Sequence, residues 1–341
     1  MTKVAILDDY PRLALKLADW SPVQSRAEVT VFDRHLSEDE AAEALQPFDV
    51  ICTLRERMAF PRTLIERLPS LKLITIVGMS LANLDMAAAS EHGILVAHPN
   101  FANPAFAAAG ATVPELVWGL MMATVRNLAE EHRRMREGGW QASAGTTLHG
   151  KTLGLLGLGR SGKIINGYAK FFGMEVIAWS QNLTDEAAAA VGARRVEKEA
   201  LFREADVISI HLVLSERTQG LVAGPELALM KPSAYLINTS RGPIVDEVAL
   251  IAALKAGQIA GAGLDVYDVE PLPPDHPLRS LPNVTLSPHF GYVTRELLGA
   301  IYSDTVESVA AWLDGEPIRI ANREALAERS AGTQDGKVDH D

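Results

Sequence analysis

The sequence has one cysteine, Cys52, among 341 residues, so it can form no internal disulfide and lacks the cysteine spacing of a metal cluster. It also lacks an excess of positive charge. The formal net charge of −11 argues against a nucleic-acid backbone or an anionic membrane surface as partner. The longest apolar runs, such as LKLITIVGM, are too short to span a bilayer, and MTKVAILDDY lacks a signal-peptide pattern. These absences predict a soluble protein of the reducing cytoplasm, without metal, nucleic acid or membrane.

The length of the chain predicts two domains, because a domain usually holds roughly 100–200 residues. Apolar residues make up 48% of the chain and charged residues 22%, which is typical of a globular protein. The last segment, AERSAGTQDGKVDHD, is polar and lacks periodicity. We therefore expect residues 326–341 to form a tail outside both domains.

Short apolar runs rich in branched residues alternate with helix-like stretches along the first hundred residues. They predict strands at 3–9, 29–32, 49–54, 72–77 and 94–97. Gly93, just before the last of these runs, suits the position that follows a helix C-terminus. Strands that alternate with helices indicate βαβ units and a parallel sheet.

A second alternating series begins at Thr152. It predicts strands at 152–157, 175–179, 206–212, 234–240, 261–266 and 284–288. Long helical patterns flank the series at 112–137 and 294–315. Thr112 and Glu115 have the spacing of a capping box, with Pro114 tolerated in the first turn, so the first helix is predicted to begin there. Together the two series predict an α/β fold with two doubly wound parallel sheets.

The stretch GLLGLGRSGK contains Gly157-x-Gly159-x-x-Gly162, which follows a predicted strand and opens a helix near Ser161. In this context the first glycine allows a tight turn, the second lets the backbone approach a pyrophosphate, and the third lets the helix pack on the strand. Free amides and the helix dipole then favour the anion. The alternative is an ordinary glycine-rich turn, but the context favours a dinucleotide.

The residue that would hold the adenosine ribose is uncharged. A dinucleotide site usually has an acid about 20 residues after the turn, at the end of the second strand. Here that place is taken by Ser180, followed by Gln181 and Asn182. Without a carboxylate a 2′-phosphate is not repelled, and no arginine follows at once to hold one. The sequence therefore leaves NAD and NADP both open.

Three polar residues lie at or just beyond the ends of predicted strands: Arg241, Glu270 and His289. Ligands of an open parallel sheet bind outside the carboxyl ends of its strands, so these side chains could meet over one ligand. Taken singly they could be a surface arginine, a solvated loop charge and a loop histidine. Together they suit hydride transfer to a ketone. A histidine can donate the proton, a carboxylate can keep it protonated, and an arginine can hold a substrate carboxylate.

Four stretches are similar to those of one known family: LLGLGRSG, ADVISIHLVLSERTQGL, LINTSRGPIVDEVALIAALKAGQIAGAGLDVYDVEPLPPDHPL and LPNVTLSPHFGY. With them the sequence resembles the D-isomer-specific 2-hydroxyacid dehydrogenases over nearly its whole length. The resemblance places the family's catalytic arginine, glutamate and histidine on Arg241, Glu270 and His289. It implies that Arg241 also holds the substrate carboxylate, and that the amides of Gly78 and Met79 receive it.

The resemblance also implies which residues line the cofactor cleft. Asp265 matches an aspartate that contacts the nicotinamide carboxamide. The implied cofactor-binding residues are Gly157, Gly159, Arg160, Ser161, Gly162, Ser180, His211, Thr239 and Asp265. The sequence departs from the family at Ser80, where a glycine is common. Arg55 and Arg57 follow the third predicted strand, and either meet an anionic substrate or lie in a solvated loop.

For the domains, the resemblance implies a discontinuous, flavodoxin-like substrate domain of residues 1–102 and 291–325. A Rossmann-type cofactor domain, residues 103–290, is inserted into it and usually forms a homodimer contact. The implied reaction is hydride transfer between NAD(P)H and a small, anionic 2-keto acid or D-2-hydroxy acid.

Phosphite or formate oxidation on the same fold is one alternative, although the family's formate dehydrogenases carry glutamine at the position of Glu270. A dinucleotide-sensing binding protein, like the corepressors that share the fold, is another. NAD is favoured slightly over NADP on family grounds.

Overall fold

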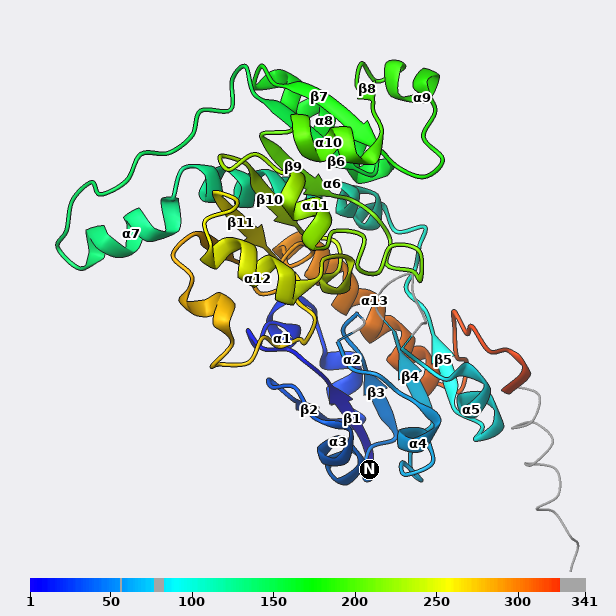
Figure 1. Ribbon diagram of the computed structural model, residues 1–341. Coiled ribbons are helices and arrows are strands. Elements are labelled where there is room, and N and C mark those ends of the chain that lie inside the picture. Colours follow the sequence, from blue (N-terminus) through cyan, green and yellow to red (C-terminus); the bar gives the residue numbers. More distant parts are fainter. Residues whose placement is uncertain (56, 77–82, 326–341) are drawn as a thin grey trace, which may run out of the picture. The chain divides into compact units, whose positions relative to one another are not determined.

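The computed structural model describes residues 1–55, 57–76 and 83–325 (Figure 1). Contacts along the chain divide it into two compact units. One comprises Met1–Ala107 together with the segment that begins at Thr294, and the other comprises Ala108–Val293. We call them the outer-segment unit and the central unit, and describe each by itself.

The outer-segment unit is built on one parallel sheet. Its strands are β1 (Thr2–Ile6), β2 (Ala27–Val31), β3 (Val50–Cys52), β4 (Leu73–Thr75) and β5 (Leu95–Ala97). The strands are ordered β2-β1-β3-β4-β5 and every neighbouring pair is parallel. This is the flavodoxin-like order, with its switch point between β1 and β3. The predicted fold of this part is confirmed.

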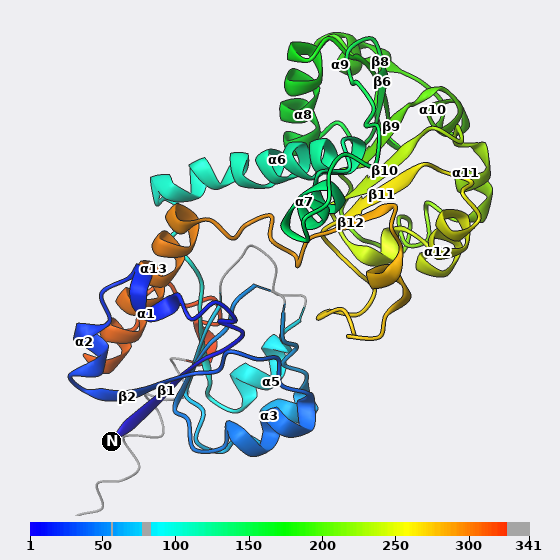
Figure 2. The ribbon, with the colours of Figure 1, turned by 90° about the vertical axis from the view of Figure 1, so that its left-hand side faces the viewer.

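Helices cover the sheet of the outer-segment unit. They are α1 (Ala14–Leu17), α2 (Ser21–Gln24), α3 (Glu38–Ala44), α4 (Arg62–Ile65), α5 (Met86–Glu91) and α13 (Arg295–Leu313). Although α13 comes 200 residues after β5 in the sequence, it lies beside α1 and α2 (Figure 2). Local signals explain two boundaries: the Thr294 hydroxyl accepts from Leu297 N at the start of α13, and Gly93, at φ +64°, follows the end of α5.

The central unit has seven parallel strands. They are β6 (Thr152–Leu156), β7 (Glu175–Trp179), β8 (Arg194–Arg195), β9 (Val207–Ile210), β10 (Tyr235–Asn238), β11 (Gly261–Leu264) and β12 (Val284–Leu286). Their order is β12-β11-β10-β9-β6-β7-β8. Counted from β6, this is the doubly wound Rossmann order with one extra strand at the far edge. The predicted fold class is therefore confirmed for both units.

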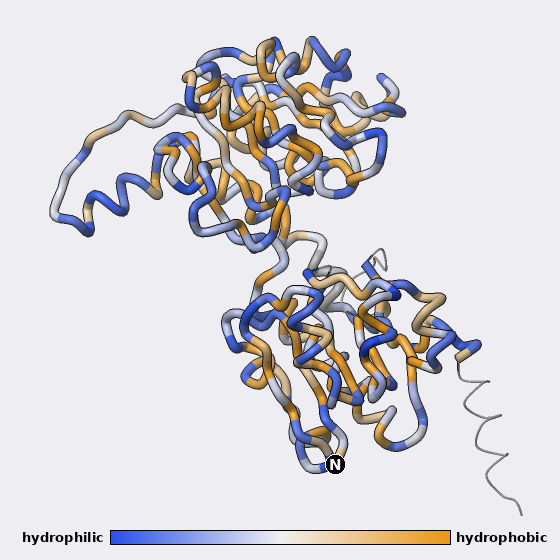
Figure 3. Tube along the Cα trace, turned by 60° about the horizontal axis from the view of Figure 1, so that its bottom comes forward, coloured by the Kyte–Doolittle hydropathy of each residue, from blue (hydrophilic) through white to orange (hydrophobic). Residues whose placement is uncertain are grey.

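Helices and two 3₁₀ turns precede and connect the strands of the central unit. They are α6 (Pro104–Val125), whose first turn belongs to the other unit, α7 (Leu128–Arg136), α8 (Arg160–Phe171), α9 (Asp185–Ala189), α10 (Lys198–Glu204), α11 (Gly224–Leu229), α12 (Glu247–Lys255) and the 3₁₀ turns η1 (Gly242–Ile244) and η2 (Pro277–Ser280). Hydrophobic and hydrophilic stretches alternate along the tube (Figure 3), and the sequence of α7, LAEEHRRMR, is mostly polar. No residue of α7 is buried.

The predicted start of the first long helix is wrong. Helix α6 begins at Pro104, so Thr112 and Glu115 lie inside it rather than at its N-terminus, and Pro114 is an internal proline. The alanine-rich run 105–111 explains the earlier start, because alanine has the highest helix propensity and proline suits the first helical position. The predicted helix over 112–137 is also interrupted at Asn127, which has φ +52° and separates α6 from α7.

Within the described ranges, no helix is both long and apolar enough to cross a bilayer.

Candidate active site

The turn between β6 and α8 has the geometry of an anion-binding loop. Gly157 has φ +102°, and a Cβ on it would lie 2.4 Å from the carbonyl oxygen of His211. A Cβ on Gly162 would lie 2.3 Å from the Gly157 oxygen. Only glycine fits at these two positions, because one needs a left-handed backbone and both face neighbouring backbone. The helix N-terminus is thereby brought against the end of β6.

The space over this turn fits a dinucleotide. Gly159 is the N-cap of α8, and a Cβ on it would meet nothing within 4 Å, so the backbone amides are open to an approaching pyrophosphate. Arg160 is the first residue of α8, and Ser161 follows it in the first turn. The guanidinium of Arg160 lies against Gly110 of α6, where a side chain would collide with it.

A buried hydroxyl at the end of β10 supports the same fit. Thr239 is 9% exposed, and its Oγ1 has no hydrogen-bond partner in the part of the chain that the structure describes. A buried hydroxyl without a partner is costly, so a polar group of a ligand at this position would satisfy it. Ser180, which directly follows β7, is half-buried and uncharged.

His211 follows β9 and is neutral at physiological pH. Its Nε2 lies 2.9 Å from the Ser209 hydroxyl, and its backbone amide donates to the Leu156 carbonyl. Burial lowers the pKa of His211 to about 4, because the charged imidazole is disfavoured away from water. A neutral His211 is not suited to donate a proton to a substrate.

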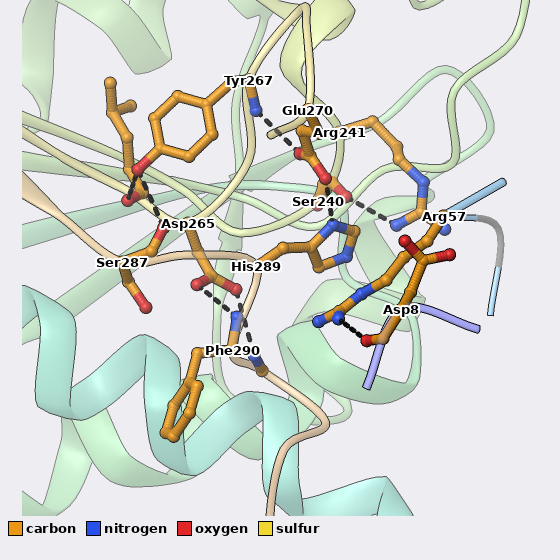
Figure 4. A network of polar contacts seen from close by, with 12 residues as sticks. Asp8, Arg57, Ser240, Arg241, Asp265, Tyr267, Glu270, Ser287, His289 and Phe290 are labelled. Carbon is orange, nitrogen blue, oxygen red and sulfur yellow. Dashed lines mark hydrogen bonds and ion pairs between the residues drawn. The ribbon is translucent and has the colours of Figure 1, made fainter. Parts of the chain in front are cut away.

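Glu270 and His289 form a hydrogen-bonded pair. The Nδ1 atom of His289 lies 2.6 Å from Oε2 of Glu270, and the two side chains are 23% and 31% exposed (Figure 4). The second oxygen of Glu270 accepts from the Tyr267 amide at 3.0 Å. Because both carboxylate oxygens are engaged, the carboxylate has a defined orientation toward the imidazole.

Asp265 positions the backbone of His289. The His289 amide donates to the Asp265 carbonyl at 2.8 Å, and His289 itself has φ +52°, an uncommon backbone for a non-glycine residue. The Asp265 carboxylate accepts from the amides of Phe290 and Gly291, at 2.7 and 3.1 Å. Asp265 is 1% exposed, and this burial raises the pKa of its carboxyl group. The end of β11 thus holds the segment that carries His289.

Arg241 follows β10 and is held by its own segment. Its Nη1 donates to the Ser240 carbonyl at 2.8 Å, and its backbone carbonyl accepts from Asn238 Nδ2 at 3.0 Å. The next residue, Gly242, touches the Tyr267 backbone so closely that a Cβ would lie 2.1 Å from it. Figure 4 shows Arg241, Glu270 and His289 gathered in one region of the central unit.

Sequence reasoning missed the residues that support this group. Tyr267 is 6% exposed, and its hydroxyl lies within hydrogen-bond distance of the Leu264 and Ser287 carbonyls, which ties the ends of β11 and β12 together. Asn238 and Ser240 fix the turn before Arg241. The glycine at 242, directly after the arginine, was the one available signal of a close approach.

The outer-segment unit carries a polar cluster of its own at the carboxyl ends of β1 and β3. The Arg57 guanidinium donates to the Asp8 carbonyl at 2.9 Å and lies 4.8 Å from the Tyr10 ring centroid. Asp8 is 2% exposed, and its burial raises the pKa of its carboxyl group. Gly78, Met79 and Ser80, for which the sequence predicted the substrate loop, lie outside the described residues.

Among the described residues, no group of three or more His, Cys, Asp or Glu side chains is arranged to hold a metal ion.

Known proteins resemble the chain over most of its length. The family described as "D-isomer specific 2-hydroxyacid dehydrogenase, NAD binding domain" matches residues 118–291. A glyoxylate reductase of Aeropyrum pernix is 37% identical over 280 residues, which cover 79% of this chain and 82% of that protein. A D-3-phosphoglycerate dehydrogenase of Methanocaldococcus jannaschii is 35% identical over 93% of this chain, which spans only 58% of that longer protein.

A solved structure is similar to this chain over nearly its whole length. The crystal structure of a putative D-3-phosphoglycerate dehydrogenase oxidoreductase from Ralstonia solanacearum superposes with a TM-score of 0.85 at 31% identity, covering 96% of this chain and 98% of that one. The fold and the glycine turn define a nicotinamide-dinucleotide oxidoreductase, as predicted. The chain belongs to the D-isomer specific 2-hydroxyacid dehydrogenase family. Its relatives do not favour formate or phosphite oxidation, or a binding role without catalysis.

Proposed function

We propose that this chain reduces a small 2-oxo acid, with glyoxylate as the first candidate, to the corresponding hydroxy acid. The observation that carries the proposal is the 2.6 Å contact between Glu270 and His289, at the sheet edge that also holds the glycine turn. The central unit is the cofactor domain in this proposal, and the outer-segment unit is the substrate domain. The glyoxylate reductase named above supports the choice of substrate.

His289 is the proton donor. Reduction of a carbonyl places negative charge on its oxygen, which then needs a proton, and a reduced nicotinamide supplies the hydride when it is bound. His289 begins protonated and gives the proton from Nε2, because Nδ1 faces Glu270. The Glu270 carboxylate, 2.6 Å away, favours the imidazolium over the neutral ring. In the reverse reaction His289 begins neutral and accepts the proton.

Arg241 holds the substrate carboxylate. A guanidinium presents two parallel N–H groups to a carboxylate and polarises the neighbouring carbonyl, which suits a 2-oxo acid. The amides of Gly78 and Met79 are proposed to bind the same carboxylate. Asp265, at the end of β11, is proposed to contact the nicotinamide carboxamide.

We propose that the pocket accepts both NAD and NADP, with NAD preferred. Ser180 brings no charge to the ribose, so a 2′-phosphate meets no repulsion from that residue. The neighbouring Arg195 of β8 is engaged elsewhere: its Nε donates to the Leu183 carbonyl, and its Nη2 lies 3.0 Å from Glu197. Discrimination against NADPH is therefore weaker than with an aspartate at position 180.

We also propose a homodimer formed through the cofactor domain. Helix α7 and the chain that returns from it to β6 extend away from the sheet of their own unit (Figure 1). Exposed apolar side chains lie along this arm: Leu128 (52%), Met135 (53%) and Trp140 (69%). A second copy would cover them. Sedimentation of wild type and of Trp140→Ser tests this, since a dimer that uses the arm is weakened by the change. The cytoplasm remains the expected location.

The activity is tested by following absorbance of NADH and NADPH with a panel of 2-oxo acids that includes glyoxylate and pyruvate. We expect turnover with glyoxylate, and no reduction of NAD⁺ by formate or phosphite. Binding of the dinucleotide without turnover of any 2-oxo acid would instead indicate a sensing protein.

A further inference from the structure

The segment that carries Glu270 runs from the end of β11 to η2 with little secondary structure of its own. Its later half is tied by Arg279, whose Nε donates to the Pro273 carbonyl at 2.8 Å and whose Nη2 donates to the Leu272 carbonyl at 2.7 Å. Its earlier half begins with the buried residues Val266 and Tyr267, and only the two residues directly before Glu270 are exposed, with Val269 at 63%. The Tyr267 amide holds one oxygen of Glu270, and contacts from outside the segment can fix the exposed backbone on either side of it.

Glu247 contacts this segment on both sides of Glu270. One of its oxygens lies 3.0 Å from Nε2 of His276, and the other accepts from the Asp268 amide at 3.4 Å, a long hydrogen bond. Glu247 and His276 are only 18% and 17% exposed. A single carboxylate therefore joins a point two residues before Glu270 to a point six residues after it.

Glu247 is a firm anchor because it is the first residue of α12. The N-cap Asp246 accepts from the Ala249 amide at 3.0 Å, and Leu250 and Leu254 are buried in the core at 2% and 3% exposure. A side chain at the start of such a helix moves little. The contacts of Glu247 with His276 and the Asp268 amide therefore hold the segment that carries Glu270 against α12.

The other nitrogen of His276 sets the orientation of its ring. His276 is the N-cap of η2, where Nδ1 accepts from the Leu278 amide at 3.4 Å. With Nδ1 as an acceptor, the hydrogen of the neutral ring is on Nε2 and points at Glu247. The contact thus exists whether or not His276 is protonated. Several carboxylates lie close together here. Burial and the charges of Glu247 and Asp246 raise the pKa of Asp268, and His276 acts in the opposite direction.

We propose that Glu247 and His276 form a clamp that positions the Glu270 carboxylate against His289. Both are positioning residues that act through Glu270, and neither touches the substrate in this scheme. The inference rests on the proposed roles of Glu270 and His289.

Three variants test the clamp. Glu247→Gln weakens the contact with His276, and His276→Asn keeps an acceptor near Nδ1 but cannot reach Glu247. His276→Gln places an amide near Nε2 and is the conservative variant. We expect the first two to lower kcat about 10-fold, within the roughly 100-fold that a 1 Å misplacement can cost, with the KM for NADH unchanged. The pH above which reduction declines should fall in both, and His276→Gln should restore most of the loss.

The control is Glu226→Gln, which removes another ion pair of similar burial: Lys198 Nζ lies 2.8 Å from Glu226, at 24% and 15% exposure. It should leave kcat and the pH profile unchanged. His276→Asn also separates geometry from charge. If the lost charge of Glu247 acted directly on His289, only Glu247→Gln would move the pH profile, and the clamp would be wrong.

Glu270→Gln distinguishes failure of the clamp from failure of the proposed function. If Glu270→Gln moves the pH profile but both clamp variants behave as wild type, the clamp is overturned and the proposed function stands. If Glu270→Gln has no effect, both fall. The double variant Glu247→Gln/Glu270→Gln should be no worse than Glu270→Gln alone, because residues that act through one group are not additive. Additive losses would show that Glu247 acts elsewhere.

Discussion

Replacing Glu270 by glutamine removes the charge beside His289 while keeping the size of the side chain. The amide oxygen can still accept from the Tyr267 amide, as Oε1 does at 3.0 Å, so the segment should stay in place. What is lost is the attraction between the carboxylate and the imidazolium across 2.6 Å. The other groups that face the imidazole, Asp265 and the Tyr292 ring at 5.9 Å, are unchanged.

The size of the effect follows from distance and exposure. Two unit charges 2.6 Å apart attract by about 6 kcal/mol at an effective dielectric constant of 20, and by less than about 2 kcal/mol in water. The side chains are 23% and 31% exposed, so solvent screening places the interaction toward the lower figure. The expected effect of Glu270→Gln is therefore a displacement of the pH profile rather than a loss of all activity.

The direction is fixed by the protonation state that each reaction needs. Reduction requires the imidazolium, which the carboxylate stabilises, so in wild type reduction persists to higher pH. In Glu270→Gln the declining limb of reduction moves to lower pH. The rising limb of the oxidation rate also moves to lower pH. At low pH, Glu270→Gln should therefore reach a larger fraction of its maximal oxidation rate than wild type does.

The assay is the initial rate of NADH oxidation at saturating glyoxylate from pH 5.5 to pH 10. A primary isotope effect with deuterated NADH first establishes that hydride transfer limits the rate in both proteins. Glu226→Gln serves again as control, since it alters a carboxylate that pairs with Lys198 rather than with His289. A declining limb at the same pH in wild type and Glu270→Gln would show that Glu270 does not tune His289, and would refute the pairing of their roles.

Three further predictions follow from the site. Arg241→Lys should lose most activity while NADH affinity, measured by fluorescence titration, persists, because an ammonium cannot bind a carboxylate with two prongs; near-normal kcat would remove Arg241 from substrate binding. Ser180→Asp should shift the ratio of kcat/KM toward NADH through repulsion of the 2′-phosphate, and a wild-type enzyme that already rejects NADPH by orders of magnitude would contradict this view of the pocket. The NMR signal of the His211 ring, identified with His211→Asn, should stay constant from pH 8 to pH 5.5, because its pKa is lowered to about 4; a titration near pH 6.5 would show that the ring is hydrated.

The two parallel sheets could be predicted from the sequence, because runs of branched residues and their alternation with helix patterns are local features of the chain. Buried parallel strands appear as short runs of branched residues, and the structure places β7 and β9 within such runs, while β1 starts one residue before the predicted run. The positions of Arg241, Glu270 and His289 followed from one rule, that the carboxyl ends of parallel strands share an edge. The rule predicts only that these residues lie near one another. The pairing of Glu270 with His289 was predicted from the chemistry of a carboxylate beside an imidazole.

The features that could not be predicted from the sequence depend on packing between segments that are distant along the chain. Pro114 looked like the beginning of a helix, yet α6 runs through it because Val117 and Met121 are buried and the preceding alanines favour helix. Strand β8 has two residues, both arginines, which no apolar pattern announces. The contact of Glu247 with His276 joins residues 29 apart, and neither lies in a motif that predicts the other.

The order of the strands determines the order in which the proposed cofactor-binding residues follow one another along the sheet. Along the sheet, the ends of β7, β6, β9, β10 and β11 follow one another, and they carry Ser180, the glycine turn, His211, Thr239 and Asp265 in that order. Neighbouring strands lie about 4.8 Å apart, so Ser180 and Asp265 are separated by four steps, or about 19 Å. In the proposed arrangement, a dinucleotide laid along this edge with its pyrophosphate on the turn would have its adenosine at Ser180 and its nicotinamide beside β10 and β11. That is where Arg241 and the segment of His289 leave the sheet. In the proposed site, His289 and the nicotinamide meet at this end of the sheet because β12, which precedes His289, pairs with β11. A strand inserted between β11 and β12 would separate them.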